Sequence, residues 1–240
     1  MKMDIRSYMK YNPKLADLLS CLPEHVVDTI PVRTYRPGEF IIRWGEGACD
    51  TFYIIRGVCC STCNFVSGDK VWYRKATAGD IFGLNGVLNT SKYEMKSGEI
   101  LTKTKVVLAV FSQELVHESF RKYPLFAEKI TGSILRRLND ETWRQSECSF
   151  YPAYMGIITY LIFAYEFYLR TYSAGYTGSV KILEQRKEIA EFMGMNVRTL
   201  QRYLPVIVKE GLVKMHSKYI YIDAAHYEAL KKRKMEYFSE

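Results

Sequence analysis

Turn-forming residues divide residues 33–111 into short segments, and this spacing constrains the fold more than any other feature of the chain. The turns are Pro37-Gly38, Gly45-Glu46-Gly47, Arg56-Gly57, Ser67-Gly68-Asp69, Ala78-Gly79-Asp80 and Ser97-Gly98. Between them lie runs rich in β-branched and aromatic residues, such as DTFYIIR and TKVVLAVF. Strands separated by turns about every 8–12 residues are typical of sandwiches and barrels. The pattern predicts an all-β domain, preceded by a short helical segment over residues 12–30.

A long helical pattern follows Ser112, where glycine becomes sparse. Over residues 124–149 apolar side chains recur at helical spacing. They are Leu125, Phe126, Ile130, Ile134, Leu135, Leu138 and Trp143. A helix of this length exceeds what a small β domain needs to cover its own core. We therefore expect the same helix of a second copy to cover it in a dimer; the alternative is a helix folded back on its own barrel.

Proline marks the end of this helical pattern. Pro152 disfavours helix in the residue before it, so we expect a domain boundary at residues 150–152. A second helix should then run over residues 153–171 and lead into a loop at residues 173–178. A compact, helix-rich segment is expected from about Val180 onwards.

The most apolar run of the chain, residues 155–169, predicts a buried helix rather than a membrane span. It contains Glu166 and is shorter than the roughly 20 residues that cross a bilayer. The first residues, MKMDIRSYMKYNP, also lack the apolar core of a signal peptide. We therefore expect a cytoplasmic protein with no membrane partner.

Residues 183–213 read LEQRKEIAEFMGMNVRTLQRYLPVIVKEGLV and predict two helices joined by a turn. The first helix should end at Phe192, Gly194 should form the turn, and Asn196 is a favoured N-cap for the second helix. At 100° per residue, the second helix has an apolar face and an opposite cationic face. The apolar residues are Leu200, Leu204, Ile207 and Gly211, and the cations are Arg198, Arg202 and Lys209. This arrangement indicates a helix-turn-helix.

The charge of the chain favours an anionic partner. The formal net charge is +8, and residues 179–218 contain eight Lys and Arg against four Glu. The segment LVKMHSKYIYID reads as a two-stranded wing with Lys214 and Lys218 near its tip. Arginine can pair with O6 and N7 of guanine, which suits the major groove of DNA. A solvated basic face without a nucleic-acid partner is the alternative.

Pro205 lies inside the second helix of this segment. Its ring removes a backbone hydrogen bond to the carbonyl of Gln201 and is expected to kink the helix. The turn that would read bases, residues 197–202, precedes this position, so a kink leaves it intact.

Three of the six cysteines occur within GVCCSTCNF, which could suggest a metal or iron–sulfur site. The surrounding residues predict a strand, on which Cys59 and Cys63 share a face but stand roughly 13 Å apart, while Cys60 points the opposite way. One ion with Zn–S bonds of about 2.3 Å could not use all three. We therefore expect structural cysteines and no bound metal; a disulfide is disfavoured in a reducing compartment.

Five motifs, in this order, resemble the Crp/Fnr superfamily of bacterial transcription regulators over about residues 15–222. The motifs are YRPGEFIIRWGE (35–46), FYIIRGV (52–58), AGDIFG (78–83), the long helix, and RKEIAEFMGMNVRTLQRYL (186–204). The resemblance implies an α+β protein in three parts. These are an effector-sensing β-roll of the cyclic-nucleotide-binding jelly-roll type at 1–122, a dimerisation helix at 123–151, and a winged helix-turn-helix DNA-binding domain at 152–240.

The same resemblance implies partners and DNA-binding residues. The protein would be a homodimer that binds a pseudo-palindromic site in double-stranded DNA, with RNA polymerase as a further partner. The implied DNA-binding residues are Arg186, Asn196, Val197, Arg198, Thr199, Arg202, Lys214 and Lys218. The family's base readers fall on Val197, Arg198 and Arg202, whereas Asn196 and Thr199 suit phosphate. Val197 stands where the cyclic-AMP receptor has arginine and Arg198 where it has glutamate, so the half-site should differ.

Residues 79–98, GDIFGLNGVLNTSKYEMKSG, fall on the effector pocket of the family. In members that bind cyclic AMP, a glutamate after glycine accepts from the ribose hydroxyl, and an arginine before serine holds the cyclic phosphate. Here Leu84 and Lys96 occupy those places; leucine cannot accept a hydrogen bond and lysine lacks the bidentate fork. We therefore expect another small-molecule effector, or none. The candidate pocket residues are Gly83, Leu84, Asn85, Gly86, Lys96 and Ser97.

Other functional classes have less support in the sequence. No pairing of a nucleophile with a base indicates an enzyme, so no catalytic residue is predicted. The iron–sulfur branch of the family uses an N-terminal cysteine cluster, where this chain has Cys21 alone, and the four histidines are scattered. No cofactor is expected. The remaining alternative is a ligand-binding signalling module whose winged helix mediates protein–protein contacts.

Overall fold

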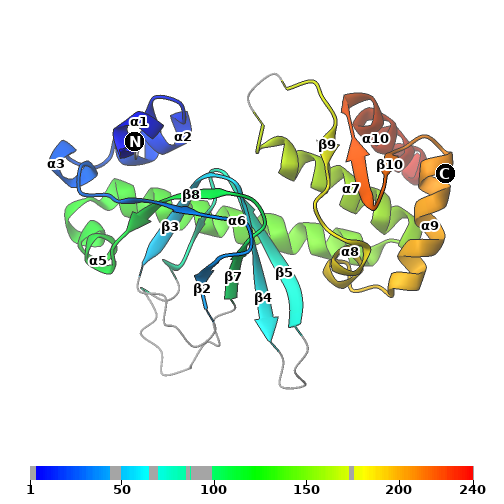
Figure 1. Cartoon of the computed structure of the whole chain (residues 1–240), viewed down its shortest axis with the longest axis horizontal. Coiled ribbons are helices and arrows are strands. Elements are labelled where there is room, and N and C mark those ends of the chain that lie inside the picture. The colour runs from blue at the N-terminus through cyan, green and yellow to red at the C-terminus, as the bar shows by residue number, and fades with distance from the viewer. Residues whose placement is uncertain are drawn as a thin grey trace. The chain divides into compact units, whose positions relative to one another are not determined.

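The computed structural model describes residues 4–43, 50–64, 70–84, 87, 99–172 and 176–239. The chain consists of two compact units (Figure 1). The first contains Met1–Lys70 and Arg74–Leu138, and the second contains Val71–Tyr73 and Asn139–Glu240. The division falls within one long helix, which therefore contributes residues to both units.

Three short helices precede the strands of the first unit: α1 (Ile5–Met9), α2 (Pro13–Leu19) and α3 (Glu24–Val27). Helix α2 begins where the sequence predicts, since the side-chain oxygen of Asn12 accepts a hydrogen bond from the Leu15 backbone N–H at 3.0 Å. Pro13 stands at the first helical position, where its missing N–H costs no intrahelical bond. Helix α1 was not expected; Asp4 caps it by accepting from Ser7 N–H at 2.8 Å.

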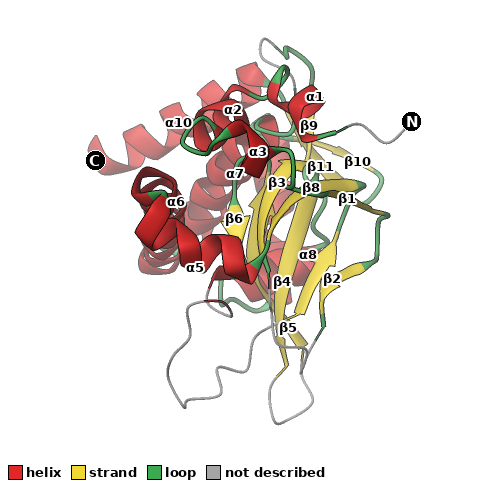
Figure 2. Ribbon diagram, turned by 90° about the vertical axis from the view of Figure 1, so that its left-hand side faces the viewer, coloured by secondary structure: helices red, strands yellow, loops and turns green. Residues whose placement is uncertain are grey.

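The strands form two four-stranded sheets, which confirms the all-β prediction for this part of the chain. One sheet has the order β1-β8-β3-β6 and the other β2-β7-β4-β5 (Figure 2). The strands are β1 (Val32–Tyr35), β2 (Phe40–Ile42), β3 (Thr51–Arg56), β4 (Val58–Asn64), β5 (Lys70–Thr77), β6 (Ile81–Phe82), β7 (Glu99–Thr102) and β8 (Val106–Phe111). The pairings whose register is described are antiparallel.

Alternation along the strands separates two cores. Phe52 and Ile54 of β3 belong to an apolar cluster with Cys59 of β4 and Ile100 of β7, so side chains of both sheets fill it. Tyr53 and Ile55 of β3 belong instead to a second cluster, on the other side of that strand.

Helices supply the second cluster of the first unit. Beside α1, α2 and α3, it contains Val116 of α5 (Gln113–Lys122) and Phe126 and Ile130 of α6 (Pro124–Phe150). These residues are almost completely buried, and Ile134 packs against them. The helix predicted at 124–149 is therefore present, and one face of its first half folds back on the β domain of its own chain.

The other face of α6 is exposed along its length. Leu125, Leu135, Trp143 and Phe150 are 63%, 56%, 72% and 86% exposed. The alternative of a helix folded back on its own barrel therefore holds for Phe126 and Ile130, whereas the four exposed residues are left uncovered in this single chain.

The second unit contains four further helices and a small sheet. Its elements are α7 (Ala153–Leu169), β9 (Val180–Lys181), α8 (Arg186–Phe192), α9 (Val197–Lys209), β10 (Lys214–His216), β11 (Tyr219–Ile222) and α10 (Ala224–Ser239). The strand order is β10-β11-β9, and both pairings are antiparallel. Helices α7, α8 and α9 and the two wing strands were predicted from the sequence, whereas β9 and α10 were not.

Helix α7 is the buried helix that the apolar run predicts, and most of its side chains are buried. Glu166 is accommodated because its carboxylate accepts a hydrogen bond from the Tyr227 hydroxyl of α10 at 2.8 Å. In the part of the chain that the structure describes, no helix combines the length and apolarity needed to cross a membrane.

Candidate nucleic-acid interface

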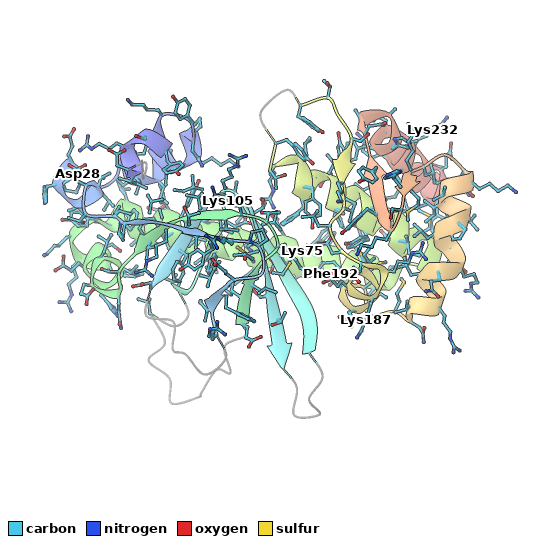
Figure 3. The ribbon with its side chains drawn as sticks, in the orientation of Figure 1. Asp28, Lys75, Lys105, Lys187, Phe192 and Lys232 are labelled. Carbon is cyan, nitrogen blue, oxygen red and sulfur yellow. The ribbon has the colours of Figure 1, made fainter. Side chains whose placement is uncertain are left out.

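Helix α8 and its turn set the position of the following helix. Gln185 and Glu188 form a capping box at the start of α8, in which the Gln185 backbone N–H donates to Glu188 Oε2 at 2.9 Å. Figure 3 labels Lys187, whose side chain is 78% exposed, and Phe192 at the end of this helix. Gly194 then has φ of +62°, a left-handed conformation that favours glycine, which confirms the predicted turn.

Helix α9 begins at Val197, as the sequence predicts. The Asn196 side-chain oxygen accepts from the Arg198 backbone N–H at 2.8 Å, which caps the helix. Leu200, Leu204 and Ile207 are buried. The helix continues through Pro205, which is exposed, to Lys209.

The arginines of α9 lie opposite its buried face. Arg198 and Arg202 are both exposed and stand one helical turn apart, about 6 Å along the axis. Val197 and Thr199 are half-buried, and Asn196 is exposed. The N-terminal half of α9 therefore presents two guanidinium groups and a capped helix start to solvent.

The predicted wing is present as β10 and β11. Ser217 has φ of +54°, and Lys218 lies beside it in the exposed turn, so Lys218 is at the tip as expected. Lys214 is not near the tip: it is the first residue of β10 and pairs with Tyr221, at the other end of the hairpin. The expected place of Lys214 near the tip is therefore wrong, because the turn is formed by Ser217 and Lys218 and three residue pairs separate it from the far end of the hairpin.

Arg186, the remaining residue of the implied DNA-binding set, is the first residue of α8 and is exposed. The second unit therefore carries every member of that set.

Two aromatic residues beside these cations were not singled out from the sequence. The Arg202 guanidinium carbon lies 4.6 Å from the Tyr203 ring centroid, and Arg202 Nη2 donates to the Tyr203 hydroxyl at 3.1 Å. In the wing, Lys181 Nζ lies 3.7 Å from the Tyr219 ring centroid and Lys218 Nζ lies 5.4 Å from it. The adjacency of Arg202 and Tyr203 in the sequence was the signal from which the first contact could have been predicted.

The candidate effector pocket is described only in part. Gly83 has φ of +91°, and a Cβ there would lie 2.4 Å from the Asp50 carbonyl oxygen, so this site requires glycine. Leu84 is buried in the apolar cluster that includes the N-terminal helices. A leucine held in that cluster offers no acceptor to a ribose hydroxyl. Asn85, Gly86, Lys96 and Ser97 lie outside the described residues.

The cysteine segment forms the predicted strand β4. Cys59 is buried in the cluster between the sheets, and burial raises the pKa of its thiol. Cys60 is also buried and pairs with Leu101, one position along from the pair of Cys59 with Thr102. Consecutive strand residues point to opposite faces, so these two thiols diverge. Within the described residues, no cluster of three His, Cys, Asp or Glu could hold a metal ion.

Comparisons with known proteins agree with this architecture. Residues 32–123 match the family model of the cyclic nucleotide-binding domain. The chain is also similar to the cAMP-activated global transcriptional regulator CRP of Haemophilus influenzae. The identity is 23% over 192 residues, which are 80% of this chain and 83% of the relative.

Two solved structures illustrate the similarity of fold. FixK2 from Bradyrhizobium japonicum has a TM-score of 0.65 at 16% identity, covering 84% of this chain and 97% of that one. CLP from Xanthomonas campestris, a c-di-GMP-responsive global regulator, has a TM-score of 0.65 at 19% identity, covering 87% of this chain and 99% of that one. These likenesses show a cyclic nucleotide-binding domain over residues 32–123 and, over most of the chain, the fold of Crp/Fnr-family regulators.

Proposed function

We propose that the protein is a homodimeric, sequence-specific DNA-binding transcription regulator of the Crp/Fnr type. The observation that carries the proposal is the exposed arginine face of α9. Arg198 and Arg202 lie on this face, opposite the buried leucines of the same helix. The helix begins directly after a turn, and Asn196 caps its start. A helix of this kind fits the major groove, where arginine pairs with guanine.

The wing residues are assigned a different role. Lys214 and Lys218 are exposed cations at the two ends of the β10–β11 hairpin. Lysine is a compact charge that suits phosphate contacts, which position a protein on DNA without reading its sequence. We assign contacts with the DNA phosphate backbone to Arg186, Asn196 and Thr199 as well. We assign contacts with the bases to Val197.

The exposed face of α6 supports dimerisation. At 100° per residue, its four large exposed apolar residues lie within about 80° of one another around the helix. They are Leu125, Leu135, Trp143 and Phe150. A stripe of this size on one helix is suited to the same stripe of a second copy around a two-fold axis. The two recognition helices of such a dimer would address a pseudo-palindromic site.

The effector is assigned to a class other than cyclic AMP. The buried side chain of Leu84 removes the acceptor that the ribose contact needs. RNA polymerase is the further partner expected of a regulator of this kind.

Selection of bound DNA from a random duplex library by the full-length protein tests the proposal. We expect pseudo-palindromes whose half-sites are centred about 34 Å apart, or one helical turn. Recovery of asymmetric single half-sites alone would refute the dimer geometry. The control is the same selection with the Arg198→Ala, Arg202→Ala double variant. If the wild type enriched no sequence more than this variant does, sequence-specific DNA binding would be refuted, and a winged helix that binds protein would be favoured.

A further inference from the structure

Helix α10 contacts the C-terminal end of α9 through one tyrosine. Arg233 Nε of α10 donates to the Tyr154 hydroxyl of α7 at 3.3 Å. The same hydroxyl donates to Glu210, the C-cap residue of α9. Burial raises the pKa of Tyr154 above its usual value, so the hydroxyl stays protonated and remains a donor at neutral pH. Three helices therefore meet at this hydroxyl.

These contacts stabilise the charge of Glu210 at the end of α9. A carboxylate at a helix C-terminus faces the negative end of the helix dipole, which is unfavourable. Tyr154 donates to that carboxylate, and the positive charge of Arg233 lies next to the same hydroxyl. Arg233 is half-exposed, and its Nη1 also lies 3.9 Å from Glu236 Oε2.

The contacts continue from Tyr154 to the arginine face of α9. The Tyr154 ring meets the edge of the Tyr203 ring at a centroid distance of 6.0 Å and an interplanar angle of 64°. Tyr203 in turn carries the Arg202 guanidinium over its ring and accepts a hydrogen bond from it. An exposed arginine has many rotamers, and contact with a fixed aromatic ring reduces their number before binding.

We propose that Arg233 and Tyr154 are positioning residues that fix Tyr203, and through it the Arg202 guanidinium, in the orientation that reads DNA. The expected effect on DNA specificity rests on the proposed function. The positioning of Tyr203 rests on the contacts among α7, α9 and α10. It assigns α10 a part in DNA specificity even though no α10 residue belongs to the implied DNA-binding set.

Neighbouring residues of α10 provide matched controls. Lys232, labelled in Figure 3, is 76% exposed and pairs loosely with Glu236 at 3.9 Å. Lys232→Gln removes the same unit of charge from the same helix as Arg233→Gln, but leaves the contact with Tyr154 in place. Tyr154→Phe keeps the ring against Tyr203 and removes only the hydroxyl.

The first arm measures affinity for a selected site and for scrambled DNA. We expect Arg233→Gln and Tyr154→Phe each to lower the ratio of the two affinities by about five- to tenfold, comparable to the loss of one hydrogen bond. Lys232→Gln should leave the ratio unchanged. In an Arg202→Ala background, Arg233→Gln should have no further effect on the ratio, because the group it positions is absent. Equal loss on both DNAs, matching Lys232→Gln, would show a general charge effect and overturn the proposal.

The second arm needs no DNA. Hydrogen exchange of the free protein should be faster over residues 203–210 in Arg233→Gln and Tyr154→Phe than in wild type, with Lys232→Gln at the wild-type rate. Unchanged exchange in both variants would overturn the positioning role, whatever the protein binds. If the wild-type protein showed no preference for selected DNA, the proposed function would be wrong. The hydrogen-exchange result would still show whether Arg233 and Tyr154 position the end of α9.

Discussion

Arg202 and Lys218 are both exposed cations, yet their surroundings differ. Arg202 lies on the outer face of α9, stacked on a tyrosine, whereas Lys218 lies in the turn of a hairpin. A side chain on a helix that enters a groove can reach base edges, whereas one at a wing tip is suited to phosphate. The two residues should therefore affect DNA binding in different ways.

We predict that Arg202→Ala costs about 1–3 kcal/mol at a selected site and relaxes preference at one base pair per half-site. Lys218→Ala should weaken selected and scrambled DNA alike and flatten the dependence of affinity on salt. Titration of both DNAs at two salt concentrations measures these effects. Equal losses on both DNAs for Arg202→Ala would make Arg202 a phosphate contact instead.

Tyr53 shows how one buried hydroxyl links stability to pH. It is 2% exposed and donates to the Asn12 side-chain oxygen at 3.3 Å, and burial raises its pKa to about 12 from 10.0. Because the folded state disfavours the phenolate, the stabilisation is fully present below pH 10 and is lost as the pH rises from 10 towards 12.

We predict that wild type loses more unfolding free energy between these pH values than Tyr53→Phe does. The difference should be on the order of 2 kcal/mol. Chemical denaturation at pH 8, 10 and 11.5 measures it, and other tyrosines contribute equally to both proteins. Parallel pH profiles for the two proteins would contradict this assignment.

At the scale of elements, α6 divides its apolar residues between two tasks. Phe126 and Ile130 complete the core of the first unit, whereas Trp143 and Phe150 remain exposed. Core residues should govern folding, and the exposed residues should govern association.

We predict that Trp143→Ser converts the proposed dimer to monomer at micromolar concentration while leaving the thermal stability of the isolated chain little changed. Because a two-fold axis relates the two copies, the substitution removes the side chain from both. A tryptophan buried in an interface commonly contributes about 2 kcal/mol or more to the free energy of association. Sedimentation equilibrium measures the dissociation constant, which should rise by at least about tenfold. Phe120→Ser is the matched control, because Phe120 is 48% exposed but lies on α5. A dissociation constant equal to that of wild type in Trp143→Ser would place the interface elsewhere.

At the scale of the whole molecule, the property to test is the affinity of the full-length protein for cyclic AMP. Residues 32–123 match the cyclic nucleotide-binding domain, but Leu84, which the family resemblance places at the ribose acceptor, is packed into an apolar cluster. A buried polar group of a ligand without a partner lowers affinity strongly.

We predict that cyclic AMP neither binds with a micromolar dissociation constant nor changes affinity for selected DNA. Isothermal calorimetry with the full-length protein, repeated in the presence of DNA, checks both statements. Mass spectrometry of small molecules released from the purified protein would then identify the effector class. A micromolar constant for cyclic AMP would show that other residues replace the missing acceptor.

Most of the local elements could be predicted from the sequence, with α1, β9 and α10 as exceptions. Turn residues every few positions divided the strands, Asn196 and Gly194 marked the start of α9 and its turn, and proline ended α6 at its predicted boundary. These features depend on contacts between residues close in sequence, so they can be read without the fold. The opposed apolar and arginine faces of α9 follow from helical periodicity for the same reason.

Which surfaces pack together became visible only in the folded chain. Periodicity placed Phe126 and Trp143 in one amphipathic pattern, and packing against the β domain buried the first and left the second exposed. Likewise, no spacing rule joins Arg233 to Tyr154, which lies 79 residues earlier. Such pairs form when whole helices pack, and many distant contacts contribute together to that packing. The different burial of the two faces of α6 and the contacts that link α10 to α9 could therefore be seen only in the folded chain.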